Sequence, residues 1–311
     1  MTKVNRIILA PMEGVMDAQM RHIITQFGSL DYCVSEFVRV VDSRLPEHVF
    51  LKACPELQIG GKSNNVPLRV QLLGSHGDYL AENAITALKL GSYGVDLNFG
   101  CPAKKVNNSH GGAVLLKNPE DVYNIVKTVR MALGNEPILS AKMRLGYEDT
   151  SLAFENAKAI EEAGATELSI HGRTKQQAYS GKADWLMIGA IKKQVHIPII
   201  ANGDITSFAT AQQCMDKSGC DDIMIGRGCL ALPNLAAVIH GDGKLSWHNL
   251  LKLMDCYGNQ FALQNKSRYY CRRIKQWLRY LMVEYPEAAI LFDKIKHLQT
   301  EEAIKQQLEN E

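Results

Sequence analysis

Short apolar runs alternate with longer amphipathic segments along most of the chain. Most of the runs are rich in branched aliphatic residues and lie close to a glycine, a proline or a polar residue, which is typical of buried parallel strands. They predict strands at 7–10, 32–34, 68–74, 95–98, 138–143, 168–171, 198–202 and 222–225. The segments between them predict helices at 17–26, 79–90, 120–133, 152–163, 184–194 and 207–217.

Eight strands that alternate with helices predict an α/β fold, namely a (β/α)8 TIM barrel. The alternative is an open, doubly wound sheet, which often carries the glycine pattern GxGxxG after its first strand. Residues 11–16 lack that pattern, so the barrel is favoured.

From Trp247 onward only helical periodicity remains, which predicts a small all-α helical domain appended to the barrel. Pro233 and the stretch 240–244 interrupt the chain just before this change. Proline and glycine-rich stretches of this kind are common at boundaries between structural units. We therefore expect a barrel domain at 1–243 and a helical domain at 244–311.

Composition narrows the class of protein. The 311 residues are 46% hydrophobic and 22% charged, with a formal net charge of +2, which is ordinary for a globular protein and too small to indicate a nucleic-acid binder by itself. The eight cysteines show no CxxC pair and no zinc spacing, so we expect no metal site and reduced thiols in the cytoplasm. No apolar segment approaches the ~20 residues of a membrane span.

The most distinctive candidate for chemistry is Cys101, which follows a predicted strand and lies between Gly100 and Pro102. Glycine tolerates unusual backbone angles, and proline disfavours helix in the residue before it. The thiol is therefore expected on a bent loop at the end of a strand. Most free cysteines are small core residues instead, and the spacing alone leaves both interpretations open.

Polar or distinctive residues recur at the other predicted strand ends, where a TIM barrel keeps its active site. Lys142 is notable because it lies within an apolar strand, where a buried ammonium is costly without an acceptor. Glycine loops follow the seventh and eighth strands, a common phosphate site in barrels. Each residue has a structural alternative as a partner for nearby loops. The set comprises Pro11, Met12, Glu13, Gln71, Asn98, Lys142, Arg144, His171, Asn202, Gly203, Asp204, Gly226 and Arg227.

Motifs at these positions resemble those of the tRNA-dihydrouridine synthases, in the family's order and along nearly the whole chain. They lie at 10–14, 71–72, 98–102, 142–146, 171–174, 201–205 and 225–228. Residues 36–42 and 273–278 are most similar to the C-type subfamily, which acts on uridine 16 of tRNA. A bulky Phe99 in the variable slot of the Cys101 motif is a mild departure.

The resemblance implies FMN as prosthetic group, NADPH as reductant and a D-loop uridine of tRNA as substrate. Cys101 would be the catalytic acid, protonating C5 of the uracil after hydride reaches C6. Asn98 and Arg144 would hold the uracil or a nearby phosphate. The residues expected to bind FMN are Pro11, Met12, Glu13, Gln71, Lys142, His171, Asn202, Gly203, Asp204, Gly226 and Arg227.

A basic segment at 266–279 contains six basic residues and no acidic one. Such a stripe usually marks a solvated helix face, but basic side chains interleaved with aromatic ones also suit RNA. We expect tRNA contacts from Arg39, Asn98, Arg144, Tyr179, Arg273, Lys275, Trp277 and Lys296.

Three alternatives stay open at this point. The chain could carry out the same reaction at another D-loop uridine, could be a different flavin barrel that acts on a small molecule, or could be a non-catalytic RNA-binding module. The basic helical appendage favours a tRNA substrate over a small molecule. No protein partner is indicated.

Overall fold

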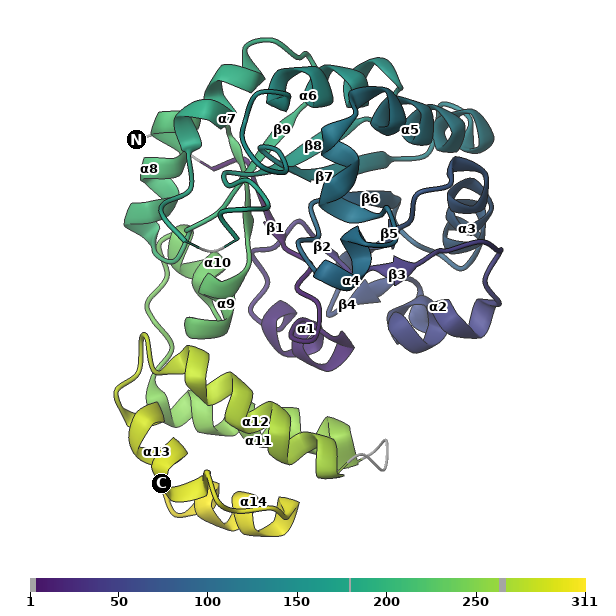
Figure 1. Cartoon of the computed structure of the whole chain (residues 1–311). Helices are drawn as coiled ribbons and strands as arrows, with labels where there is room; N and C mark the ends of the chain where they lie inside the picture. The colour runs from purple at the N-terminus through teal and green to yellow at the C-terminus, as the bar shows by residue number, and fades with distance from the viewer. Residues whose placement is uncertain (1–3, 179, 263–266) are drawn as a thin grey trace.

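A computed structural model describes residues 4–178, 180–262 and 267–311 and shows a closed parallel barrel followed by a helical region (Figure 1). The ring closes because β1 pairs with both β2 and β10, while β2 pairs with β5. The predicted TIM barrel is therefore confirmed. The eight strands of the ring are β1 (Arg6–Leu9), β2 (Tyr32–Val34), β5 (Val66–Leu73), β6 (Val95–Phe99), β7 (Leu139–Arg144), β8 (Glu167–His171), β9 (Ile199–Asn202) and β10 (Asp222–Ile225).

Helices surround the barrel (Figure 1), and their ends follow local sequence signals. Helix α5 begins with Pro119 after an Asn118 cap, and α8 begins with a capping box between Ser207 and Thr210; both devices satisfy or remove free backbone donors. The barrel helices are α1 (Ala18–Thr25), α3 (Gly77–Lys89), α5 (Pro119–Leu133), α6 (Ala153–Glu162), α7 (Trp185–Lys192), α8 (Phe208–Ser218), α9 (Arg227–Ala231) and α10 (Leu235–Ile239).

Several short elements were not predicted. They interrupt the simple alternation after β2 and after β6, and each is too short to show a hydrophobic period. They are β3 (Val38–Arg39), β4 (Lys62–Ser63), α2 (Glu47–Ala53) and α4 (Lys104–Asn107), together with 3-10 turns at Pro55–Ile59 and Gly112–Lys117.

The helical region consists of α11 (Trp247–Ala262), α12 (Ser267–Leu281), α13 (Glu287–Ile295) and α14 (Glu301–Glu309). It packs on the barrel where α11 meets α1 and α12 meets α9. Trp277 is central to this contact: it is only 1% exposed, and its indole nitrogen donates to the carbonyl of Leu230 at 3.1 Å. The predicted change to all-helical structure is thus present, while a separate domain at 244–311 stays a prediction.

None of the described helices combines the length with the apolar character that a membrane crossing requires.

The end of the barrel where the strands begin holds a buried ionic network. Glu167 accepts from Arg69, from Tyr32 at 2.6 Å and from Arg6 at 2.8 Å, and Arg6 also pairs with Asp222 at 2.7 Å. Burial alone would raise the pKa of Glu167, but Arg69, Tyr32 and Arg6 together hold that pKa below its usual value. Glu167 is therefore ionised at neutral pH, and its negative charge balances the positive charges of Arg69 and Arg6.

We expect Glu167→Gln to destabilise the protein by about 3–5 kcal/mol, because removing one partner leaves buried charge uncompensated. The lowered pKa means that this contribution is complete above the ordinary glutamate pKa of about 4.3 and is lost as the pH falls through the folded-state value. Urea unfolding of both proteins from pH 7 to pH 3 measures this difference.

The matched control is Glu162→Gln, which removes an exposed carboxylate 3.7 Å from Lys158 and should change stability by less than ~1 kcal/mol. Equal losses in the two variants, or a Glu167→Gln loss that does not shrink in acid, would contradict the assignment.

Candidate active site at the mouth of the barrel

The parallel register brings the predicted strand-end residues to one rim of the barrel. Asn98 of β6 lies opposite Lys142 of β7, Arg144 lies opposite His171, and His171 lies opposite Asn202. Carboxyl ends of barrel strands form the active sites of this fold. The structure therefore gathers these residues around one opening, as the strand-end argument predicts.

Asn98 shapes the loop that carries Cys101. Its side-chain oxygen accepts from the backbone N–H groups of Gly100 at 2.8 Å and of Cys101 at 2.9 Å. On the other side, Asn107 donates to the carbonyl of Cys101 at 2.9 Å. Both backbone groups of Cys101 are thus held by side chains, and the position of the sulfur is set by the fold.

A chain of buried hydrogen bonds orients Asn98 in turn. Its amide nitrogen donates to Gln71 at 2.7 Å, and Gln71 donates to Asp96 at 2.7 Å. Asp96 also accepts from Ser140 at 2.5 Å. The amide nitrogen of Gln71 thus points toward Asp96, which leaves the Gln71 oxygen to accept from Asn98. The same logic turns the Asn98 oxygen toward Cys101.

The Cys101 thiol lies in a largely enclosed setting. It is 8% exposed and packs with Leu73 and Val106, so the apolar surroundings of a core cysteine are present as well. Burial is the main cause that raises the pKa of this thiol. Cys101 is therefore protonated at neutral pH, which suits a proton donor.

Two basic residues at this end of the barrel have strongly lowered pKa values. Burial, together with the charge of Arg144, lowers the pKa of Lys142 to about 8. Burial, followed by the charges of Lys142, Arg144, Arg173 and Arg227, lowers the pKa of His171 to about 2. His171 is consequently neutral, while Lys142 stays mostly charged at neutral pH.

Two buried polar groups at this end of the barrel have the chemistry to bind a ligand. Within the described part of the chain, His171 Nδ1 and Arg173 Nη1 are buried without a partner. Buried polar groups are normally paired, so such exceptions mark places where a ligand or water belongs. These groups, together with the charged Lys142, fit an anionic cofactor with hydrogen-bonding edges such as FMN.

The predicted phosphate loops have distinct roles. Gly203 adopts a φ of +120°, and a side chain there would come within 2.9 Å of Ala183. The carboxylate of Asp204 accepts from Arg173 at 2.8 Å and lies 3.8 Å from Arg227, so this acid aligns the two arginines. Asn202 donates to the carbonyl of Met224 at 2.7 Å. Gly203, Arg173 and Arg227 are thus the residues here that are suited to bind an anion.

The β1–α1 loop forms another side of the mouth. Pro11 and Met12 are half-buried. Glu13 is more exposed, yet the partial burial of its carboxyl raises the pKa of Glu13. A side chain on Gly226 would lie 3.3 Å from the sulfur of Met12. The loop after the first strand therefore touches the loop after the last one.

Several residues expected to contact tRNA have other roles in the structure. The guanidinium of Arg144 is buried and donates to the carbonyl of Gly100 at 2.9 Å and to that of Thr174 at 3.1 Å. Arg273 is 4% exposed and Trp277 is 1% exposed. In this structure these three hold loops or join the helical region to the barrel, and their contact with tRNA stays a prediction.

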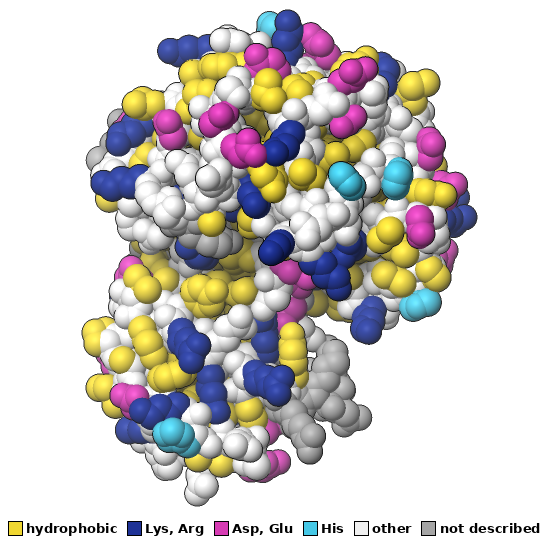
Figure 2. Space-filling model, in the orientation of Figure 1, with side chains coloured by type: hydrophobic (Ala, Val, Ile, Leu, Met, Phe, Trp, Pro, Cys, Tyr) yellow, Lys and Arg dark blue, Asp and Glu magenta, His cyan; other side chains and the backbone are white. Residues whose placement is uncertain are grey.

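The remaining expected tRNA contacts lie nearer the surface. Arg39 is half-buried and donates to Ser109 at 2.9 Å, and Lys275 donates to the carbonyl of Lys296 at 3.0 Å. The side chain of Lys296 is exposed, and Tyr179 lies outside the described residues. Figure 2 shows Lys and Arg side chains gathered over α12.

Sequence patterns missed the residues that support the site from behind. Asp96 is the one that a signal could have revealed, since an acid in an otherwise apolar strand needs a partner. Asn107 and Gly112 had no such signal. A side chain on Gly112, where φ is +68°, would lie 3.0 Å from the Cβ of Cys101.

We expect Gly112→Ala to displace the Cys101 loop and to destabilise the protein by about 1–3 kcal/mol beyond the backbone strain. The control is Gly134→Ala, which has a similar φ of +73° but no atom within 4 Å of the new methyl group. Urea unfolding and mass-spectrometric mapping of Cys101 alkylation should separate the two variants. Identical stability and identical alkylation rates would show that Gly112 does not position the thiol.

Comparison with known proteins identifies the family. A family model described as dihydrouridine synthase (Dus) matches residues 8–309. The chain is 52% identical over 306 residues to a tRNA-dihydrouridine(16) synthase of Shewanella oneidensis, covering 98% of this chain and 97% of that protein. It is 48% identical over 306 residues to one of Haemophilus influenzae, covering 97% and 99%.

Solved structures support the barrel fold. An old yellow enzyme homologue of Zymomonas mobilis aligns with a TM-score of 0.55 and 17% identity, over 78% of this chain and 90% of that one. Histamine dehydrogenase from Rhizobium sp. 4-9 aligns with a TM-score of 0.57 and 14% identity, over 76% of this chain and 45% of that one. At these identities the likeness concerns the fold, whereas the match along the whole sequence decides the family. The chain belongs to the dihydrouridine synthase family.

Proposed function

We propose that the protein reduces the C5–C6 double bond of uridine 16 in the D-loop of tRNA to 5,6-dihydrouridine, with FMN as prosthetic group and NADPH as reductant. The observation that carries this proposal is the thiol of Cys101, held on a fixed loop at the barrel end that also carries Lys142 and His171. The names of the full-length relatives support position 16. We place the reaction in the cytoplasm.

The residues at the mouth divide naturally into two groups around FMN. Lys142 and His171 would face the flavin ring, and the Gly203 and Arg227 loops would hold its phosphate. Gln71, held by Asp96 and Asn98, would contact the flavin ring beside Lys142. Bound and reduced, FMN supplies a hydride to C6 of the uracil.

Cys101 completes the reduction. As C6 gains its hydrogen, the electron pair of the double bond moves to C5 and the adjoining carbonyl. The S–H bond of Cys101 breaks, the proton forms a new C–H bond at C5, and a thiolate remains. The charges of Arg144 and Lys142 favour that thiolate, which regains a proton from water before the next turnover.

Access to the mouth requires the target base to leave its stack, because neither C5 nor C6 can be approached within a stacked loop. The helical region provides basic surface for the surrounding RNA. Arg272 and Arg279 of α12 are exposed, and α12 contains no acidic residue. Contacts with phosphates from such a surface position the RNA and depend strongly on salt.

We expect Cys101→Ala to lower dihydrouridine formation by about 10²–10⁴-fold, the usual contribution of a general acid. FMN absorbance and tRNA affinity should be retained, since the thiol is not needed for either. The assay measures tRNA-dependent NADPH oxidation and dihydrouridine content by mass spectrometry.

The control is Cys256→Ala, which removes a half-exposed thiol on α11 and should leave the rate unchanged. Full activity of Cys101→Ala would remove Cys101 from the mechanism. A wild-type protein that binds no FMN, or that reduces no uridine in tRNA, would refute the function itself.

We expect the double substitution Arg272→Glu and Arg279→Glu to weaken tRNA binding at least tenfold and to reduce the slope of affinity against salt by about two phosphate contacts. FMN binding should not change. A suitable control is Lys193→Glu, an exposed lysine that follows α7 at the opposite end of the barrel. Equal effects of the two charge reversals would place the RNA elsewhere.

A further inference from the structure

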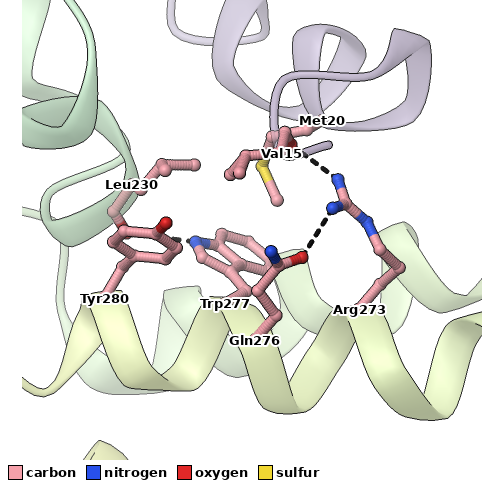
Figure 3. A pocket seen from close by; sticks show the side chains of 7 residues that line it. All are labelled: Val15, Met20, Leu230, Arg273, Gln276, Trp277 and Tyr280. Atoms are coloured by element: carbon pink, nitrogen blue, oxygen red, sulfur yellow. Dashed lines mark hydrogen bonds between the residues drawn. The ribbon is translucent and has the colours of Figure 1, made fainter. Parts of the chain in front are cut away.

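Arg273 connects the helical region to the β1–α1 loop of the barrel. From α12, its guanidinium donates to the carbonyl of Val15 at 2.6 Å and to that of Gly14, and it pairs with Asp17 at 2.8 Å. Figure 3 shows the side chain reaching from α12 toward this loop. The arginine is only 4% exposed, so these interactions operate away from bulk water, where charge pairs are screened least.

The helical side holds the same guanidinium equally firmly. Its Nε donates to the hydroxyl of Tyr257 on α11 at 3.2 Å, and Nη1 donates to Gln276 at 2.6 Å. A planar guanidinium with several donors in fixed directions imposes an orientation on all its acceptors. Movement of α12 relative to the barrel would therefore displace Gly14, Val15 and Asp17.

The β1–α1 loop transmits that constraint to the active-site mouth. The carbonyl of Met12 accepts from the N–H of Val15 at 3.0 Å and from that of Met16 at 2.9 Å, which closes a tight turn. The Met12 side chain packs over Gly226, next to Arg227. One short turn thus links Arg273 with the loop to which we assign the FMN phosphate.

A purely structural function for Arg273 is the competing explanation. Trp277, however, already joins α12 to α9 by burying its ring and bonding to Leu230. Buried ion pairs contribute little net stability compared with apolar packing, but they can specify a single arrangement. The contacts of Arg273 are of that kind, since they fix where the loop lies on α12.

We propose that Arg273 is a positioning residue that couples the FMN pocket to the tRNA-binding helix α12. The coupling rests on the proposed function, because it presumes that FMN occupies the mouth and that tRNA binds α12. By thermodynamic reciprocity, FMN then strengthens tRNA binding by the same factor by which tRNA strengthens FMN binding.

The test is a linkage measurement on the full chain. The affinity for unmodified tRNA is measured by fluorescence anisotropy for the FMN-free and FMN-loaded protein, and the ratio of the two dissociation constants is the coupling. We expect a ratio of about 5–150 for the wild type. In Arg273→Gln the ratio should fall toward one, and FMN should bind more weakly in fluorescence titrations.

Two further variants separate coupling from folding and from charge. Arg272→Gln removes an exposed charge from the neighbouring position; it should weaken tRNA binding in both forms and keep the ratio. Asp17→Asn still caps α1, because asparagine is a good N-cap, but it removes the ion pair and should lower the ratio as Arg273→Gln does. Melting curves confirm that each variant is folded.

A wild-type ratio of one, or an unchanged ratio in both Arg273→Gln and Asp17→Asn, overturns the coupling while leaving the proposed function intact. A wild-type protein that binds no FMN overturns the proposed function and the coupling with it.

Discussion

One buried acid, Asp96, organises the mouth of the barrel. Its oxygens accept from Gln71 and Ser140, which fixes how Gln71 is turned, and Gln71 fixes how Asn98 is turned. Asn98 then holds the backbone N–H of Cys101. The Cys101 loop thus depends on a chain of hydrogen bonds that begins at Asp96 inside β6, passes through Gln71 of β5 and returns to Asn98 of β6.

The groups at this end of the barrel differ in their protonation states at neutral pH. Burial keeps Cys101 protonated and His171 neutral, yet Lys142 keeps most of its charge at neutral pH. A proton donor, a neutral ring and a cation therefore coexist at one barrel rim. Separating protonation states by environment in this way is how one fold supports both hydride acceptance and proton donation at the same substrate.

Sequence patterns predicted the barrel well because buried parallel strands such as 199–202 and 222–225 are nearly continuous apolar runs. They also placed Cys101 correctly at a strand end. They did not reveal the burial of Arg273 and Trp277, since periodicity shows that a helix has two faces but does not show what each face packs against. They did not reveal the partners of Arg144 for a related reason: the carbonyls of Gly100 and Thr174 are backbone atoms that leave no trace in a sequence.

The central claim is that this barrel saturates one particular uridine. The most direct measurement incubates the purified protein with FMN, NADPH and an unmodified tRNA transcript, followed by nuclease digestion and mass mapping of every fragment. We expect a gain of two hydrogen atoms confined to uridine 16. A transcript without any gain, or with the gain at a different D-loop uridine, would contradict it.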